Sequence, residues 1–309
     1  MQGLVGSKTF TVVDELPHGK KAVGSRWVLS YKSDTNGQIT KANARLVLVA
    51  KGFRQREGLE YLQTFMPTLA AASVKIVMAV AHQYKVYHLD VAKAFANFKA
   101  TLDYEVCMKL PGGCGDLSGK YVRFEKALYG RKQNGLLWND LLVVKLVTVH
   151  GMEQCKSDPC VFRLVREVKV VLILAVHVQD MAVADSRGEV HKLLVVLNEN
   201  FTTNDLGELS FFMGCVFSQD LEKGMLSMTQ TAFIETLARI FYLTTTFLYP
   251  ASPDAKLGAR MEGESSSTWP YRKVVEGLMW VVVMTRPDIG NAVRAVARQS
   301  TRGRNTGNQ

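Results

Sequence analysis

The stretch ILAVHVQDMAVAD, residues 173–185, carries the most information about the fold. Branched apolar residues on both sides predict two strands, because such side chains suit a pleated, half-buried surface. His177, Gln179 and Asp180 interrupt the apolar run at its middle. Polar residues between two such runs predict a hairpin turn near residues 178–181. An amide and a carboxylate side by side in an otherwise buried hairpin need an explanation from the rest of the chain.

Strands and helices mix along the chain without a regular alternation, which favours an α+β fold. Hairpins are predicted where β-prone runs flank turn residues, and helices where apolar residues recur at helical spacing. The predicted hairpins cover residues 25–53, 158–185 and 207–230, and the predicted helices cover residues 72–85, 126–151, 186–201, 231–241 and 271–284. Asn36-Gly37 marks the turn of the first hairpin, Ser186 is the predicted N-cap of a helix, and residues 250–268 are a predicted mobile connector.

The composition is that of an ordinary globular protein, with 309 residues, 47% apolar and 21% charged. No apolar run is long enough to span a bilayer and no secretory signal opens the chain, so we expect an intracellular protein, cytoplasmic or nuclear, without a membrane partner. The five cysteines lack a metal-type pattern and are expected to be reduced.

The net charge of +10 favours an anionic partner, with nucleic acid the first candidate. Nine Lys or Arg and one acid lie between Lys20 and Arg56. Apolar residues interleave with these charges, which is typical of basic side chains on strands that also contribute to a core.

The chain carries no Walker A loop, no GxGxxG, no HExxH and no paired CxxC. Two acidic residues in strand-like segments remain: Asp90 follows VYHL, and Asp180 follows AVHVQ. Two carboxylates on neighbouring strand ends are what a two-metal phosphoryl-transfer site requires, and Mg²⁺ prefers such hard oxygen ligands. Taken alone the pattern is weak, because an Asp at a strand end is more often a turn former.

The order of several segments resembles the reverse transcriptase of copia-type retrotransposons, from about Phe10 to Arg298. Residues 16–68 resemble the finger region of that family, and KALYGRKQNGLLW, residues 126–138, resembles its LYGLKQ block. HLDVAKAF, residues 88–95, resembles the first catalytic block. Residues 205–230 resemble the primer-grip region, and residues 271–293 resemble the segment that leads toward ribonuclease H.

This resemblance implies an RNA-directed DNA polymerase with fingers, palm and thumb subdomains. Its implied partners are an RNA or DNA template–primer and deoxynucleoside triphosphates, and its implied cofactor is a pair of Mg²⁺ ions. By position, Asp90 and Asp180 would bind metal and Gln179 would belong to the catalytic turn. The other implied roles are nucleotide binding for Lys41, Arg45, Phe95 and Gln133, and primer grip for Phe212, Met213 and Gly214.

The sequence departs from the family pattern at the catalytic turn. HVQD, residues 177–180, stands where the family has Tyr-Val-Asp-Asp, so Gln179 replaces the first of two aspartates. Losing one unit charge close to two divalent ions costs several kcal/mol, and each 1.4 kcal/mol is tenfold in rate. We therefore expect polymerase activity lowered by roughly three orders of magnitude or more. Asp185 is not expected to substitute, because five residues along a strand place it on the opposite face.

Other departures, including Arg131 in place of the leucine of LYGLKQ, suggest a degenerate copy of the element. The expected organisation is fingers and palm over residues 1–215, the end of the primer-grip hairpin and thumb-like helices over 216–249, and a linker and helical segment over 250–309. That last segment would lead toward a ribonuclease H domain expected to be missing from this chain. Two alternatives stay open: a polymerase that tolerates Gln179, and a non-enzymatic remnant that binds nucleic acid.

Overall fold

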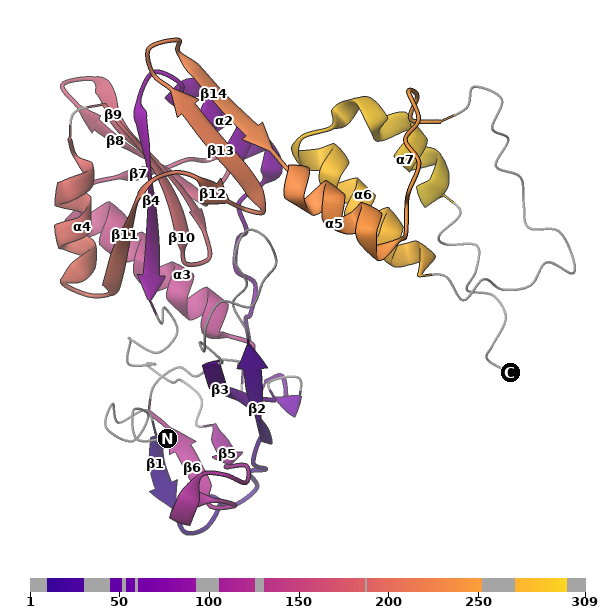
Figure 1. Cartoon of the computed structure of the whole chain (residues 1–309). Coiled ribbons are helices and arrows are strands. Elements are labelled where there is room, and N and C mark those ends of the chain that lie inside the picture. Colours follow the sequence, from indigo (N-terminus) through magenta and orange to yellow (C-terminus); the bar gives the residue numbers. More distant parts are fainter. Residues whose placement is uncertain are drawn as a thin grey trace, which may run out of the picture. The chain divides into compact units, whose positions relative to one another are not determined.

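The protein is described by a computed structural model over residues 10–30, 45–51, 54–58, 61–92, 106–125, 131–186, 188–251 and 270–298. The chain forms two compact units, Met1–Leu209 and Ser210–Gln309, whose elements are labelled in Figure 1. Among the described residues, no helix has the combined length and apolar character needed to cross a membrane.

The first unit is built around a six-stranded antiparallel sheet. β4 lies between β11 and β10 in this sheet (Figure 1). In spatial order the strands are β11 (Thr202–Glu208), β4 (Lys85–Ala92), β10 (Asp180–Asp185), β9 (Lys169–His177), β8 (Val161–Arg166) and β7 (Glu153–Gln154). β8, β9 and β10 arise from the segment predicted as a hairpin with two turns, and that prediction is confirmed.

Two helices supply most of the side chains that cover one face of this sheet. They are α3 (Asn134–Val144), which continues as one π-helical stretch (Lys145–Val149), and α4 (Val190–Asn198). Trp138 and Leu142 of α3 and Leu193 of α4 join Leu89 and Met181 of the sheet in one buried cluster. A third helix, α2 (Ala71–Ala81), buries the four residues that its helical spacing selects: Val74, Val77, Met78 and Ala81.

The first unit also contains two small sheets. One has the order β1 (Phe10–Val13), β6 (Tyr121–Phe124), β5 (Cys107–Lys109), and the other pairs β2 (Ser25–Ser30) with β3 (Arg45–Ala50). A short 3₁₀ helix, Gly115–Leu117, lies between β5 and β6. Phe10, Val23, Met108 and Phe124 are among the residues of a separate buried cluster here.

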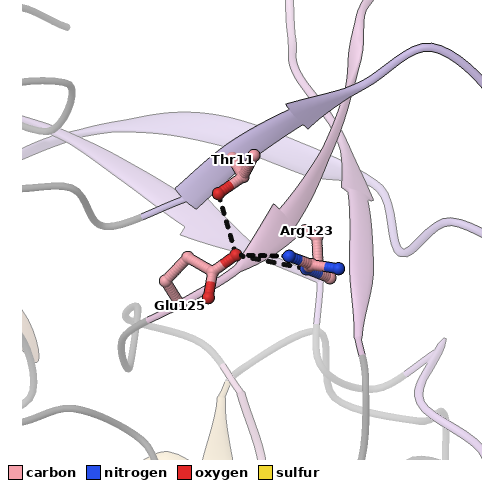
Figure 2. A network of polar contacts seen from close by, with 3 residues as sticks. All are labelled: Thr11, Arg123 and Glu125. Carbon is pink, nitrogen blue, oxygen red and sulfur yellow. Dashed lines mark hydrogen bonds and ion pairs between the residues drawn. The ribbon is translucent and has the colours of Figure 1, made fainter.

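A surface network ties β1 to the end of β6. Oε1 of Glu125 accepts hydrogen bonds from Thr11 Oγ1 at 2.8 Å and from Arg123 Nε at 3.1 Å (Figure 2). These contacts, the Thr11 bond first, lower the pKa of Glu125. The carboxylate therefore stays ionised where the two strands meet.

The second unit combines a three-stranded sheet with helices. Its strands are β12 (Phe211–Phe212), β13 (Cys215–Asp220) and β14 (Met225–Thr229), and its helices are α5 (Thr231–Ile240), α6 (Tyr271–Met284), the 3₁₀ turn Pro287–Ile289 and α7 (Gly290–Ala297). Helices α5 and α6 approach closely at Gly277, where an added Cβ would lie 2.9 Å from Leu237 Cδ2. A larger residue would require the Leu237 side chain to shift.

The predicted mixture of hairpins and helices is confirmed, with local corrections. Ser186 is not the N-cap of α4: the cap residue is Glu189, and Ser186 Oγ donates to the carbonyl of Val171 at 2.9 Å. Within the described part of the predicted helix over 126–151, which begins at residue 131, regular α-helix runs from Asn134 to Val144. The turn at Asn36-Gly37 and nearly all of the connector 250–268 lie outside the described residues. The two compact units divide after Leu209, and the predicted subdomain boundaries stay a prediction.

Candidate active site

The two predicted metal-binding carboxylates lie opposite each other on neighbouring strands. Asp90 of β4 and Asp180 of β10 are register partners in the antiparallel ladder. Side chains of directly opposed residues lie on the same face of a sheet. Leu89 and Val91, the neighbours of Asp90, are fully buried in the core on the other face. The alternation of β4 therefore places the acid on the face opposite the core.

The hydrogen-bond pattern shows that this pair is closely spaced. The N–H of Val91 donates to the carbonyl of Gln179 at 3.0 Å, so Asp90 and Asp180 form a non-hydrogen-bonded pair, the kind in which opposed side chains come closest. Like charges directly opposed destabilise a sheet. A bound cation would remove that penalty.

The same row of the sheet extends to further polar residues on both sides. His177 of β9 is the register partner of Asp180, and Asn204 of β11 is the register partner of Asp90. His88, two residues before Asp90 on β4, places Nε2 3.6 Å from Asp180 Oδ1. The row therefore offers oxygen and nitrogen atoms that could bind a metal ion on four neighbouring strands. Only two of its members are carboxylates.

The turn that precedes Asp180 has an unusual backbone. Val178 and Gln179 form a two-residue loop between β9 and β10, and Val178 has φ of +60°. This region is costly for a β-branched residue and is usually occupied by glycine. Trp138 of α3, which is buried, donates its Nε1–H to the carbonyl of Val178 at 2.7 Å. Helix α3 thus holds the turn from the core side.

Asp185 lies at the far end of β10, opposite Lys85, and is buried. Its Oδ2 accepts the N–H of Val190 at 3.0 Å, in the first turn of α4. A negatively charged carboxylate at the N-terminal end of a helix is stabilised by the positive end of the helix dipole. Asp185 is therefore an acceptor at the start of α4, and the expectation that it does not substitute at the turn stays a prediction.

The donors around the turn suit a divalent cation, but they are few. Asp180 keeps a side chain 43% exposed, so an ion and its water ligands have access to it. Across the described parts of the chain, no group of three or more His, Cys, Asp or Glu side chains is arranged to hold a metal ion. Asp90 and Asp180 supply two carboxylates of the hard oxygen type that Mg²⁺ prefers.

The predicted nucleotide-binding residues are only partly described. Lys41 and Phe95 lie outside the described residues. Arg45 is the first residue of β3, paired with Ser30, and only its backbone is described. Gln133 is buried at the start of α3, where its carbonyl accepts the N–H of Leu137 at 3.0 Å. Its side-chain Oε1 accepts a hydrogen bond from Gln55 Nε2 at 3.0 Å.

Arg131, two residues before Gln133, is almost fully buried, with 4% of its surface exposed. Among the residues that the structure describes, none of its three guanidinium nitrogens has a hydrogen-bond partner. Its charge lies 5.3 Å from the ring centre of Phe124, and burial lowers its pKa to about 10. The resemblance marks Arg131 as a departure from a leucine, and only the fold reveals that the charge is buried and lacks a hydrogen-bond partner among the described residues.

The predicted primer-grip residues form the tip of a hairpin in the second unit. Phe212 ends β12 and is buried, and Met213 and Gly214 form the two-residue loop to β13. Both loop residues have positive φ, +47° and +74°, as a type I′ turn requires. Glycine suits the second position, where an added Cβ would also lie 3.6 Å from Trp280 Nε1.

Comparisons with known proteins identify the family of this chain. A family profile described as "Reverse transcriptase (RNA-dependent DNA polymerase)" matches residues 7–252. The chain is 32% identical over 300 residues to the retrovirus-related Pol polyprotein from transposon RE1 of Arabidopsis thaliana, covering 95% of this chain and 20% of that protein. It is 29% identical over 311 residues to the corresponding polyprotein from transposon TNT 1-94 of Nicotiana tabacum, covering 96% and 23%.

The solved structures include a foamy viral protease–reverse transcriptase in complex with double-stranded DNA. That likeness has a TM-score of 0.45 and 11% identity, and covers 90% of this chain and 38% of that one. The chain spans about a fifth of the length of the curated relatives it matches.

The family match covers most of the chain and includes the segments that carry Asp90, Gln133, Asp180 and Phe212. The predicted recognition and the predicted α+β, reverse-transcriptase-like fold are therefore confirmed. The chain belongs to the reverse transcriptase (RNA-dependent DNA polymerase) family, in the form found in Pol polyproteins of copia-type transposons.

Proposed function

We propose that this reverse transcriptase domain binds an RNA or DNA template–primer and deoxynucleoside triphosphates, and that it polymerises DNA slowly because Gln179 replaces an aspartate. The observation that carries the proposal is the opposed pair of Asp90 and Asp180, with a neutral Gln179 at the adjoining turn. Family membership supports the substrates, and the net charge of +10 favours an anionic partner.

Asp90 and Asp180 are the residues that would hold Mg²⁺. When bound, Mg²⁺ would neutralise charge on the triphosphate and stabilise the oxygens that attack and leave. The rigid antiparallel ladder keeps the two carboxylates in register, and Trp138 holds the turn beside them. Gln179 offers a neutral amide at the same turn, so the site carries one negative charge fewer to balance the cation and the triphosphate.

The size of the effect follows from Coulomb's law. One unit charge removed from the neighbourhood of divalent cations weakens their binding by several kcal/mol, even at an effective dielectric constant near 20. Because each 1.4 kcal/mol is tenfold in rate, polymerisation should fall by roughly three orders of magnitude. Template–primer binding depends on contacts between the phosphate backbone of the nucleic acid and basic side chains of the protein. The glutamine at position 179 should therefore change the template–primer affinity little.

The test compares primer extension on an RNA template with Mg²⁺ for the natural chain and for Gln179→Asp. We expect the variant to extend roughly 10³-fold faster, at unchanged template–primer affinity. Gln179→Asn is the matched control, because it changes the side chain but not its charge, and it should stay as slow as the natural chain.

Three outcomes would contradict the proposal in different ways. Rapid extension by the natural chain would show that the turn tolerates glutamine. Failure of Gln179→Asp to extend, with template–primer still bound, would favour a remnant that only binds nucleic acid. Absence of binding by either protein would remove the substrate assignment.

A further inference from the structure

β11 is an edge strand of the six-stranded sheet in the described part of the chain, with β4 on one side. Thr203 is the register partner of Val91, whose N–H donates to Gln179 on the side of β10. The Thr203 backbone therefore faces away from β4, and its N–H donates to Asn198 Oδ1 at 2.9 Å. Because backbone groups alternate along a strand, the Asp205 backbone also faces outward. Its N–H and carbonyl point to where a further strand would lie.

A pocket with a volume of about 510 Å³ opens beside this edge, between α4 and β11. That volume is within the roughly 300–1,000 Å³ of typical ligand pockets. Leu194 and Val195 give the pocket an apolar wall. Thr203 also lines the pocket, and its buried hydroxyl has no hydrogen-bond partner in the described parts of the chain. The pocket therefore suits a side chain with an apolar stem and a polar end.

Two carboxylates make this pocket acidic in a chain whose net charge is +10. They belong to Glu199 and Asp205, which line the pocket and are both exposed. Lys192, on the helix that forms one wall, pairs with Glu189 at 2.8 Å. Neither pocket carboxylate forms an ion pair with another residue that the structure describes. Their charge therefore attracts a cationic group from outside this part of the chain.

Acidic residues at an exposed edge also select which strand can pair with it. Six of the seven residues of β11 are exposed, and Asp205 and Glu208 are two of them. Pairing between two copies of β11 would bring these carboxylates into one short ladder, where like charges destabilise the sheet. The ladder with β4 also shifts register after Asp205, which shortens the regular edge. A basic strand gains attraction from the charges that oppose self-pairing.

We propose that β11 and its pocket bind an extended, basic peptide segment of a partner protein. The segment adds as a strand along the outer side of β11, where the Asp205 N–H and carbonyl pair with its backbone. One Lys or Arg side chain of the segment enters the pocket. Its apolar stem packs on Leu194 and Val195, and its charged end lies with Glu199 and Asp205.

This surface is separate from the row of polar residues around Asp180. Asp205 is the register partner of Leu89, which is buried in the core, so the Asp205 side chain lies on the core side of the sheet edge. Asp90 and Asp180 lie on the opposite face. The inference therefore does not depend on metal binding or polymerisation.

The test measures binding of a fluorescent peptide, KTVRVTK, to the full natural chain by anisotropy at fixed ionic strength. Two matched peptides separate the two parts of the proposal. KTVQVTK loses the central positive charge, and KTPRPTK keeps that charge but replaces the two valines by prolines, which cannot donate backbone hydrogen bonds. We expect each matched peptide to bind at least about tenfold more weakly than KTVRVTK.

A double variant tests the pocket itself. Glu199→Gln combined with Asp205→Asn keeps the size of both side chains, and Asn still offers an oxygen to the Gly207 N–H that Asp205 accepts at 2.8 Å. We expect KTVRVTK to bind about tenfold more weakly, because two partly exposed ion pairs are lost together. The matched control combines Glu153→Gln on β7, the opposite edge strand, with Asp140→Asn on α3. It removes the same charge elsewhere and should leave the Kd unchanged.

Hydrogen exchange on the natural chain gives a second measurement that needs no variant. KTVRVTK should slow amide exchange in Thr202–Glu208 and leave Glu153–Gln154 unchanged. Equal affinity for KTVRVTK and KTPRPTK would overturn strand addition, and an unchanged Kd in the pocket double variant would overturn the role of the two carboxylates. A dimer in sedimentation, with β11 protected from exchange before any peptide is added, would assign this edge to a second copy of the chain and overturn the inference.

Discussion

The turn between β9 and β10, which we propose is catalytic, and the segment before α3 each depart from the pattern that the resemblance implies, and they do so in opposite ways. At the turn, Gln179 removes a charge at a half-exposed position beside Asp180. Before α3, Arg131 adds a charge at a position that is almost fully buried. The first change leaves the ladder of β4 and β10 intact, whereas the second leaves a guanidinium without a hydrogen-bond partner in the described parts of the chain.

The difference teaches that the environment, and not the kind of substitution, decides what a charge change affects. A half-exposed amide at a turn is solvated, so its effect falls on the cation and substrate that the site would bind. A buried cation without a partner has lost its hydration, and that penalty falls on the folded state itself. We therefore expect the two lesions to act separately, one on catalysis and one on stability.

The largest expected effect concerns the opposed carboxylates. In the Gln179→Asp background, Asp90→Asn should lower primer extension by at least about 10³-fold, because it removes one of the charges that would hold Mg²⁺. The free energy of unfolding should not fall, since one of two opposed like charges is removed. Extension assays and urea unfolding on the same preparations check this. A large loss of stability would show that the two acids also stabilise the fold, and it would contradict the expectation that this site affects catalysis alone.

The mirror-image prediction concerns Arg131. Arg131→Leu should raise the free energy of unfolding by about 3 kcal/mol, because an apolar side chain replaces a buried charge that lacks a partner. Primer extension in the Gln179→Asp background should not change. Urea unfolding measures the gain, and Arg163→Leu, an exposed position paired with Glu153, is the matched control and should give no gain. A lower free energy of unfolding for Arg131→Leu would mean that favourable contacts of the guanidinium outweigh the cost of burying its charge.

A third prediction tests whether the two regions are coupled through α3, which begins beside Arg131 and contacts the turn. Trp138→Phe removes the Nε1–H bond to the Val178 carbonyl, and should lower the free energy of unfolding by about 2 kcal/mol. It should also slow extension by Gln179→Asp, because the turn loses its support.

Phe201→Leu removes the edge-to-face partner of the same indole, whose ring centre lies 5.0 Å away, without touching the turn. It should lower stability but leave extension unchanged. If both variants slow extension equally, general loss of packing and not the bond to the turn controls the site.

The smallest expected effect concerns His150, a second buried side chain that can carry a positive charge. Burial, and then the charge of Arg166, lower its pKa below the ordinary value. Between the lowered folded pKa and the unfolded value near 6.5, the unfolded chain binds more protons. Stability should therefore fall as the pH drops below about 6.5, and stay level above it.

Urea midpoints measured from pH 7.5 down to pH 5 check this, and His150→Leu should flatten the decline. His150 differs from Arg131 in that it can release its proton when buried. An unchanged pH dependence in His150→Leu would assign the decline to other groups.

Much of the fold could be predicted because its local patterns are strong. The apolar spacing of residues 74–81 selected the buried side of α2, and apolar runs around polar turn residues predicted β8, β9 and β10. Ser186 was wrongly predicted as a cap because its hydroxyl can equally bond to a carbonyl of a neighbouring strand, and the tertiary fold offered that of Val171.

The sequence by itself determined the family, the fold class and the position of the altered turn, because these depend on the order of local patterns along the chain. Only the tertiary structure decided that Asp90 and Asp180 are register partners, that Arg131 is buried with no hydrogen-bond partner among the described residues, and that Gln55 donates a hydrogen bond to Gln133. Each of these joins residues far apart in sequence or depends on what surrounds a side chain. Strand register and burial arise from packing between elements, and no local pattern of residues specifies them.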